Sequence, residues 1–417
     1  MNDRMNDRMN DRMNPRPTLR AVDGGVTAPS GFRASGLHCG IKARRPDLAL
    51  IVSDTPATAA GVFTINLAKA APVYLCQEHL ASSGGRAIAI VTNSGCANAC
   101  TGPQGVADAR EMGQLTAAAL GCREDHVLVA STGVIGVNLK MDKLRAGIPQ
   151  AVAALTPDGG PDAARAIMTT DPFPKEHAVE VTTEFGAFRV GGMAKGSGMI
   201  EPRMATMIGY LTTDAGVDPV MLQRVVSEAS RYTFNAITVD GEPSTNDCVL
   251  ALANGASGVD INENLYPALF EGCRAVAHEL ALGVVRGGEG ATKLIAITAT
   301  GAATESDAWT AARAIANSPL VKTAVHGGDP NWGRLVAAAG RSGAAFALEG
   351  ARVQIGPLVL FENGRPFDER APQAAEYLTG KDLTIEVNLG TGGTYSATVW
   401  TCDLSADYVK INAEYRT

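Results

Sequence analysis

The sequence predicts a mixed α/β protein, and three observations support this fold class. Short apolar runs rich in β-branched residues alternate along the chain with Ala-rich segments that have helical periodicity. Aliphatic, aromatic and sulfur-containing residues make up 46% of the chain and charged residues 19%, a composition typical of globular proteins. The length of 417 residues is sufficient for two or more lobes.

The first half of the chain begins with a tail and continues with alternating elements. Residues 1–18 repeat Met-Asn-Asp-Arg three times, so we expect a disordered low-complexity tail outside the fold. A helix is expected at residues 106–120, and strands are expected at residues 48–53, 87–91 and 127–130. Two prolines and two glycines within residues 156–161 predict a loop between subdomains.

The second half of the chain shows the same α/β alternation. Asp218 and Pro219 form a favourable cap and first turn for a helix whose apolar residues follow at helical spacing. Ser306 opens an Ala-rich helix that should end near Asn317 and Pro319. Strands are expected at residues 208–211, 294–299, 383–389 and 395–404.

The charge balance and the apolar runs exclude several classes of partner. Lysine and arginine total 36 against 43 aspartates and glutamates, a net charge of −7, so we expect neither nucleic acid nor anionic membranes as partners. The apolar runs are far shorter than the roughly 20 residues that a membrane helix needs. Because the N-terminus lacks the apolar core of a secretory signal, we expect a cytoplasmic protein with reduced cysteines.

Metal, nucleotide and serine chemistry receive little support from the motifs. Cys96 and Cys100 have no second cysteine pair or nearby histidine to complete a zinc site, so no metal is expected. The Gly-rich segment 287–293 lacks the residue order of a phosphate-binding loop and carries Glu289, which would repel a phosphate. No Gly-x-Ser-x-Gly motif occurs, so threonine or lysine chemistry within residues 195–214 remains.

Thr206 is the candidate nucleophile in that segment, and its sequence context allows two interpretations. In the first, it is an ordinary residue at the start of a strand, where threonine is common. Alternatively, the chain cuts itself between Ala205 and Thr206, and the freed α-amine activates the threonine hydroxyl. An α-amine titrates near ~8 and can therefore accept a proton at neutral pH. The residues alone leave both interpretations open.

A resemblance to a known family favours the second interpretation. Residues 191–207 (GGMAKGSGMIEPRMATM) strongly resemble the self-processing segment of the ornithine acetyltransferase (ArgJ) family. The resemblance covers nearly everything after the tail and continues through residues 47–61, 93–102 (NSGCANACTG), 131–136 (STGVIG), 238–247 (TVDGEPSTND), 288–293 (GEGATK), 318–323 (SPLVKT), 331–334 (NWGR) and 400–417. Cys96 and Glu201 are minor departures from the family pattern, as is the tail.

The resemblance implies a fold, an assembly and a reaction. The implied fold is a two-lobed α/β sandwich, cut into an α-chain of residues 19–205 after the tail and a β-chain of residues 206–417 that associate as an α2β2 particle. In the implied ping-pong reaction, Thr206 takes the acetyl group from N2-acetylornithine, ornithine leaves, and glutamate becomes N-acetylglutamate. No dissociable cofactor is implied. Whether acetyl-CoA also serves as acetyl donor differs between members that share these motifs.

The resemblance also implies roles for individual residues. Thr132 and Gly133 would supply the hydroxyl and backbone N–H that stabilise the tetrahedral oxyanion. The implied substrate ligands are Thr169 or Thr170, Lys195, Thr206, Glu289, Asn412 and Thr417. Lys195 can pair with a carboxylate, and Glu289 can attract the ammonium group of ornithine.

Two other functions remain open at this point. A related N-terminal-nucleophile aminopeptidase would pass the acyl group to water instead of glutamate. A catalytically silent relative would keep the fold but would neither cut itself nor form an acetyl-enzyme. The resemblance favours the acetyltransferase because the residues implied to bind substrate are present.

Overall fold

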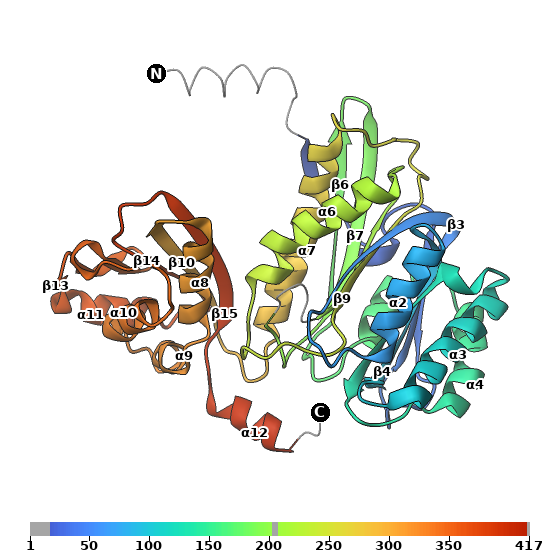
Figure 1. The fold of residues 1–417 in the computed structure, drawn as a ribbon, viewed down its shortest axis with the longest axis horizontal. Coiled ribbons are helices and arrows are strands. Elements are labelled where there is room, and N and C mark those ends of the chain that lie inside the picture. The colour runs from blue at the N-terminus through green and yellow to red at the C-terminus, as the bar shows by residue number, and fades with distance from the viewer. Residues whose placement is uncertain (1–16, 202–206, 415–417) are drawn as a thin grey trace.

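Two sheets, each at the centre of one lobe, organise the computed structural model, which describes residues 17–201 and 207–414 (Figure 1). Within these ranges the sheet of the larger lobe has nine strands: β1 (Thr18–Ala21), β2 (Phe32–Leu37), β3 (Leu48–Phe63), β4 (Arg86–Cys96), β5 (Val127–Val134), β6 (Lys175–Thr183), β7 (Gly186–Lys195), β8 (Ile208–Thr213) and β9 (Cys248–Ala253). Their spatial order is β1-β6-β7-β8-β9-β3-β4-β5, and β2 pairs with β3 beside this path.

Two groups of helices pack on the strands of the large sheet (Figure 1). The helices α6 (Pro219–Tyr232) and α7 (Tyr266–Arg286) pack on the strands β3, β6, β7 and β9, whereas α2 (Ala71–Ser82), α3 (Gly102–Leu120) and α4 (Met141–Ala153) pack on β2 to β5. Helix α5 (Gly160–Ala166) packs against β2, β3, β6 and β7. In β9, Val249 packs into the core beneath α6 and α7, whereas Leu250 packs into the opposite core. Because both faces are buried, the strand has a continuous apolar sequence instead of an alternating one.

The smaller lobe is built from the C-terminal part of the chain. Its strands, in the order β13-β12-β11-β14-β10-β15, are β13 (Arg365–Pro366), β12 (Leu358–Glu362), β11 (Arg352–Ile355), β14 (Asp382–Asn388), β10 (Leu294–Ala302) and β15 (Tyr395–Cys402). Its helices are α8 (Glu305–Ala316), α9 (Pro319–His326), α10 (Trp332–Gly340) and α11 (Ala371–Tyr377). These elements enclose a separate apolar core.

The last helix, α12 (Ala406–Glu414), lies apart from both sheets, at the lower end of the molecule in Figure 1. No residue of α12 is buried. The helix and the residue before it contact the larger lobe through polar groups of Ser405, Tyr408 and Asn412. None of the helices in the described ranges is long and apolar enough to span a membrane.

The structure confirms the α/β prediction and its two lobes, but the boundary expected at residues 156–161 is wrong. Thr156 forms a bridge with Ala34, and α5, which begins at Gly160, packs against β2 and β3. That segment is therefore an internal part of the larger lobe, and the chain enters the smaller lobe only at β10.

The start of the folded chain also differs slightly from the expectation. Thr18, which we assigned to the tail, is the first residue of β1 and pairs with Thr182 of β6. Composition alone places this polar sequence in the tail, but backbone pairing with β6 holds it in the sheet as an edge strand. Residues 1–16 lie outside the described ranges.

Neighbouring strands bring the two sides of the predicted cut together. The strands β7 and β8 are antiparallel, and Lys195 at the end of β7 pairs with Ile208 at the start of β8. The next strand, β9, is parallel to β8, with Cys248 opposite Ile208. The first residues of β8 and β9 therefore lie at the same end of the sheet, beside the last residue of β7.

Candidate active site

A pocket at the start of β8 brings together residues that are distant in the sequence. It encloses about 150 Å³, and Met207 and Ile208 contribute to its wall. The predicted site residues that line it are Thr132, Gly133, Thr169, Thr170, Lys195, Glu289 and Asn412. Ala205, Thr206 and Thr417, which complete the predicted set, lie outside the described residues.

The last residues of β5, which include Thr132 and Gly133, are held firmly in place. Gly133 has a φ of +129°, and a Cβ there would lie 2.4 Å from the carbonyl carbon of Gly95, so a side chain does not fit. The amide of Asn246 donates hydrogen bonds to the carbonyl oxygens of Ala97, at 2.5 Å, and of Ser131, at 2.8 Å. These contacts fix the backbone on which the predicted oxyanion donors lie.

One wall of the pocket carries the positive charge of Lys195, which is 8% exposed. Behind it, the buried Asp171 carboxylate accepts a hydrogen bond from the Lys175 Nζ at 2.5 Å. The same carboxylate accepts backbone N–H groups of Thr169, at 2.9 Å, and Gly196, at 2.7 Å. Burial opposes the charged form of Asp171, but the attraction of Lys195 and Lys175 holds its pKa below the usual range.

Another wall carries the carboxylate of Glu289, whose Oε2 accepts a hydrogen bond from the Asn412 Nδ2 at 2.8 Å. The Glu289 backbone N–H donates to the carbonyl oxygen of Ser197 at 2.9 Å. A Cβ at position 198 would lie 2.5 Å from the Glu289 carboxylate, which explains the glycine at this position. Asn412 of α12 thus places its side-chain amide against the Glu289 carboxylate, which faces the pocket.

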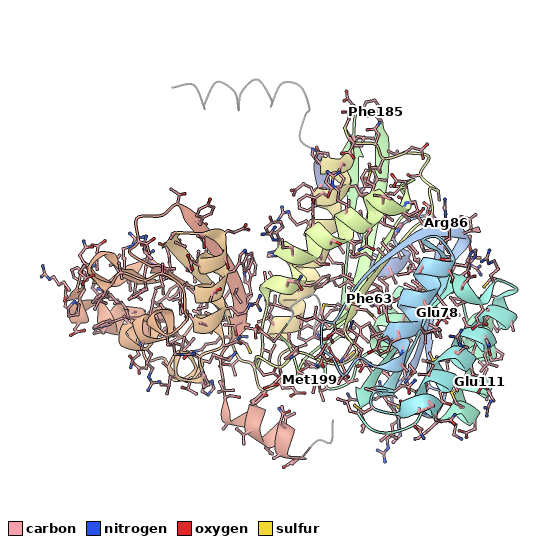
Figure 2. The ribbon with its side chains drawn as sticks, viewed as in Figure 1. Phe63, Glu78, Arg86, Glu111, Phe185 and Met199 are labelled. Atoms are coloured by element: carbon pink, nitrogen blue, oxygen red, sulfur yellow. The ribbon has the colours of Figure 1, made fainter. Side chains whose placement is uncertain are left out.

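Asp240 and Tyr408 also line the pocket, although the sequence motifs indicated no role for either residue. Asp240 accepts the backbone N–H groups of Met199, at 2.7 Å, and Ile200, at 2.8 Å. The Tyr408 hydroxyl donates to the Asp240 Oδ2 at 3.3 Å, and burial together with this carboxylate raises the tyrosine pKa. Met199 lies between α12 and the larger lobe in Figure 2, so these contacts join the pocket wall to α12.

A third acidic residue, Asp247, lies in the pocket wall at the start of β9 and is 3% exposed. Its Oδ2 has no hydrogen-bond partner within the described part of the chain. Burial raises the pKa of this carboxyl group well above its usual value, so the neutral acid is favoured. Residues 238–247 belong to the family resemblance, but their motif does not reveal that the Asp247 Oδ2 lacks a partner among the described residues.

The comparison with known proteins identifies the family. A model of the ArgJ family matches residues 33–417. The chain belongs to the ArgJ family. It is 51% identical over 402 residues to the arginine biosynthesis bifunctional protein ArgJ of Symbiobacterium thermophilum, covering 94% of this chain and 99% of that protein. The protein of the same name from Synechococcus sp. is 49% identical over 409 residues, covering 95% of this chain and 98% of that protein.

One solved structure is also similar in sequence. It is the ornithine acetyltransferase of Mycobacterium tuberculosis complexed with ornithine, which is 46% identical to this chain. The match covers 45% of this chain and 100% of that one, with a TM-score of 0.42. The family model and the two relatives of 51% and 49% identity confirm the family predicted from the sequence motifs.

Glu201, within the segment that the ArgJ resemblance marks for self-cleavage, is anchored to the smaller lobe. The Glu201 carboxylate pairs with the Arg313 guanidinium of α8 at 2.6 Å and accepts a hydrogen bond from the Asn317 Nδ2 at 2.9 Å. The side chains of Glu201 and Arg313 are 5% and 17% exposed. The Arg313 guanidinium also donates to the carbonyl oxygen of Asn235, at 2.6 Å. Glu201, which we noted as a departure from the family pattern, thus joins the two lobes.

Proposed function

We propose that this chain transfers an acetyl group from N2-acetylornithine to glutamate, with Thr206 as an N-terminal nucleophile. A pocket with opposite charges on its walls carries this proposal, because Lys195 faces it from one element and Glu289 and Asp240 from others. An amino acid with a carboxylate and a side-chain ammonium group is complementary to these charges. Relatives named bifunctional proteins of arginine biosynthesis support the same reaction.

The nucleophile forms when the chain cuts itself between Ala205 and Thr206. The hydroxyl of Thr206 attacks the Ala205 carbonyl, the amide becomes an ester, and water releases a new amino terminus. The products are residues 1–205 and 206–417, which associate as an α2β2 particle. The pocket position of Met207, the residue after Thr206, supports this assignment.

The acetyl transfer then has two half-reactions. The Thr206 hydroxyl attacks the acetyl carbonyl of N2-acetylornithine while the Thr206 α-amine accepts the hydroxyl proton. The proton passes to the departing α-nitrogen, and ornithine leaves an acetyl ester on Thr206. The glutamate amine attacks this ester, the hydroxyl regains its proton, and N-acetylglutamate departs.

The predicted site residues each have a role in these two half-reactions. Thr132 and Gly133 donate hydrogen bonds to the tetrahedral oxyanion. Lys195 binds the substrate carboxylate, and Glu289 with Asn412 receives the ornithine side-chain ammonium. Thr169 or Thr170 and Thr417 complete the contacts with the substrate. The reaction needs no dissociable cofactor, and acetyl-CoA serves as a second acetyl donor if the chain also makes N-acetylglutamate directly.

Intact-protein mass spectrometry tests this function, and Thr206→Ala is the decisive variant. The purified wild type should show two fragments divided before Thr206, and N2-acetylornithine should add one acetyl group to the fragment that begins there. Glutamate should remove it as N-acetylglutamate. Thr206→Ala should stay uncut and should lose acetyl transfer by at least about a thousandfold, because the nucleophile is absent.

Three results would contradict the proposal in different ways. Transfer by Thr206→Ala would remove Thr206 from the mechanism. If water hydrolyses the acetyl-enzyme as fast as glutamate accepts the acetyl group, the protein is an N-terminal-nucleophile hydrolase. A wild-type chain that stays uncut and gains no acetyl group would indicate a silent relative.

A further inference from the structure

Three charged side chains form a buried cluster behind the positive wall of the pocket. Asp171, Lys175 and Lys195 have side chains that are 0%, 2% and 11% exposed. Asp171 and Lys175 come from the segment that leads into β6, whereas Lys195 ends β7. Buried charges require partners, so the pairing within this cluster determines which charge remains available to a ligand.

The two lysines are not equivalent partners of Asp171. The Lys175 Nζ lies 2.5 Å from the Asp171 Oδ1, a short charge-assisted hydrogen bond. The Lys195 Nζ lies 4.0 Å from the Asp171 Oδ2, which is beyond hydrogen-bond distance. Both carboxylate oxygens also accept a backbone N–H group, from Gly196 and Thr169. Lys175 is therefore the side chain that satisfies the carboxylate.

The excess charge of the cluster lies on the pocket side. Two ammonium groups and one carboxylate give 2 − 1 = +1, and Lys195 lines the pocket whereas Lys175 does not. Lys42 is a further cation nearby, but its Nζ donates to the backbone carbonyl oxygens of Pro46, at 2.9 Å, and Met168, at 2.5 Å. Lys42 therefore does not replace Lys175 as the partner of Asp171.

We propose that Lys175 is a positioning residue that occupies Asp171 and thereby leaves Lys195 available to a substrate carboxylate. Without the Lys175 ammonium, the Asp171 carboxylate would draw the Lys195 Nζ from 4.0 Å to contact distance and away from the ligand. This inference rests on the proposed function in one respect, the binding of a carboxylate by Lys195. Both acetylornithine and glutamate carry a carboxylate, so both half-reactions should depend on Lys175.

Lys175→Met and the double variant Lys175→Met with Asp171→Asn test the inference in the full-length protein. Lys175→Met should raise the KM of N2-acetylornithine and of glutamate by about tenfold, the effect expected when one charge-assisted hydrogen bond is lost. Its kcat should change much less, because the reacting groups are untouched. The double variant removes both the ammonium and the carboxylate, so both KM values should return to within about threefold of the wild type.

Lys322→Met is the matched control. Lys322 is also a buried lysine, 3% exposed, and its Nζ donates to the Val239 carbonyl oxygen and the Thr401 hydroxyl, outside this cluster. Lys322→Met should lower the midpoint of thermal unfolding, as the loss of any buried lysine does. Adding Asp171→Asn to Lys322→Met should not reverse any change in KM. Recovery in the Lys175 double variant alone separates a charge effect from general destabilisation.

The outcomes separate this inference from the proposed function. Unchanged KM values in Lys175→Met, or no recovery in the double variant, would overturn the inference while the transferase activity stands. If the wild type transfers no acetyl group, calorimetry with N2-acetylornithine and ornithine still tests the role of Lys175. Weaker binding to Lys175→Met that is restored in the double variant supports that role. A wild type that binds neither amino acid would overturn both proposals.

Discussion

Asp247 makes the stability of the folded chain depend on pH. Burial raises its pKa above that of an unfolded aspartate, about 4, so the folded chain keeps a proton that the unfolded chain releases. The free energy of unfolding therefore falls as the pH rises between these two pKa values. Asp247→Asn does not titrate, so its stability relative to the parent should rise by up to about 1.4 kcal/mol per pH unit.

Urea unfolding between about pH 5 and 8 measures this effect. The parent should carry Thr206→Ala, because an uncut chain avoids unfolding that depends on the association of two fragments. Asp54→Asn is the control, since Asp54 is an exposed carboxylate paired with Arg33. A stability difference between Asp247→Asn and its parent that does not vary with pH would contradict the assignment.

At the scale of residues, the motifs contain side chains that line the pocket, but not the residues that support them. Lys195, Glu289 and Asn412 lie in segments quoted for the family resemblance, and the structure brings all three to one pocket. The Asp171–Lys175 pair was not predicted. Its two residues are four apart, but they lie before and at the start of a strand, where helical spacing gives no guidance. Only the folded chain shows that Lys195 approaches the same carboxylate.

The contact between the residues before β8 and helix α8 is a buried ion pair, and its loss should be costly. Arg313→Met leaves the Glu201 carboxylate buried without its guanidinium partner, so the variant should lose about 3–5 kcal/mol of unfolding free energy. The double variant Glu201→Gln with Arg313→Met removes both charges and should lose clearly less. Urea unfolding in the Thr206→Ala background measures both values.

Exposed ion pairs provide the comparison for that experiment. Arg224 pairs with Glu263 at 3.1 Å, with side chains 44% and 70% exposed, so Arg224→Met should cost about 1 kcal/mol or less. If Arg313→Met costs no more than this control, or no more than its own double variant, the ion pair does not stabilise the contact between the lobes.

At the scale of elements, local signals predicted where helices begin, but not how strands pair. The Asp218 side chain accepts the backbone N–H groups of Val220 and Met221, as its position before Pro219 indicated. The start of α8 differs from the prediction: its N-cap is Thr304 and not Ser306, because the Thr304 hydroxyl accepts a hydrogen bond from the Asp307 N–H. The placement of β8 and β9 between β7 and β3 depends on contacts between distant segments, which single-segment patterns do not report.

At the scale of the whole molecule, the sheet order predicts how the cut protein behaves. The strands β8 and β9 belong to residues 206–417, but they lie between β7 and β3, which belong to residues 1–205. Separation of the fragments would therefore expose two rows of backbone groups. After self-cleavage, the fragments should elute together in native size-exclusion chromatography and separate only in denaturant, with uncut Thr206→Ala as the size reference. Elution of free fragments without denaturant would contradict this expectation.

The distribution of the pocket along the chain also determines when self-cleavage can occur during the life of the molecule. The residues of the pocket wall extend along the sequence from Ala97 to Asn412. A chain still attached to the ribosome lacks part of this wall, and a misfolded chain does not assemble it. The proposed cleavage should then follow the completion of folding, so the cut fraction of a preparation should record how many molecules have reached the native state.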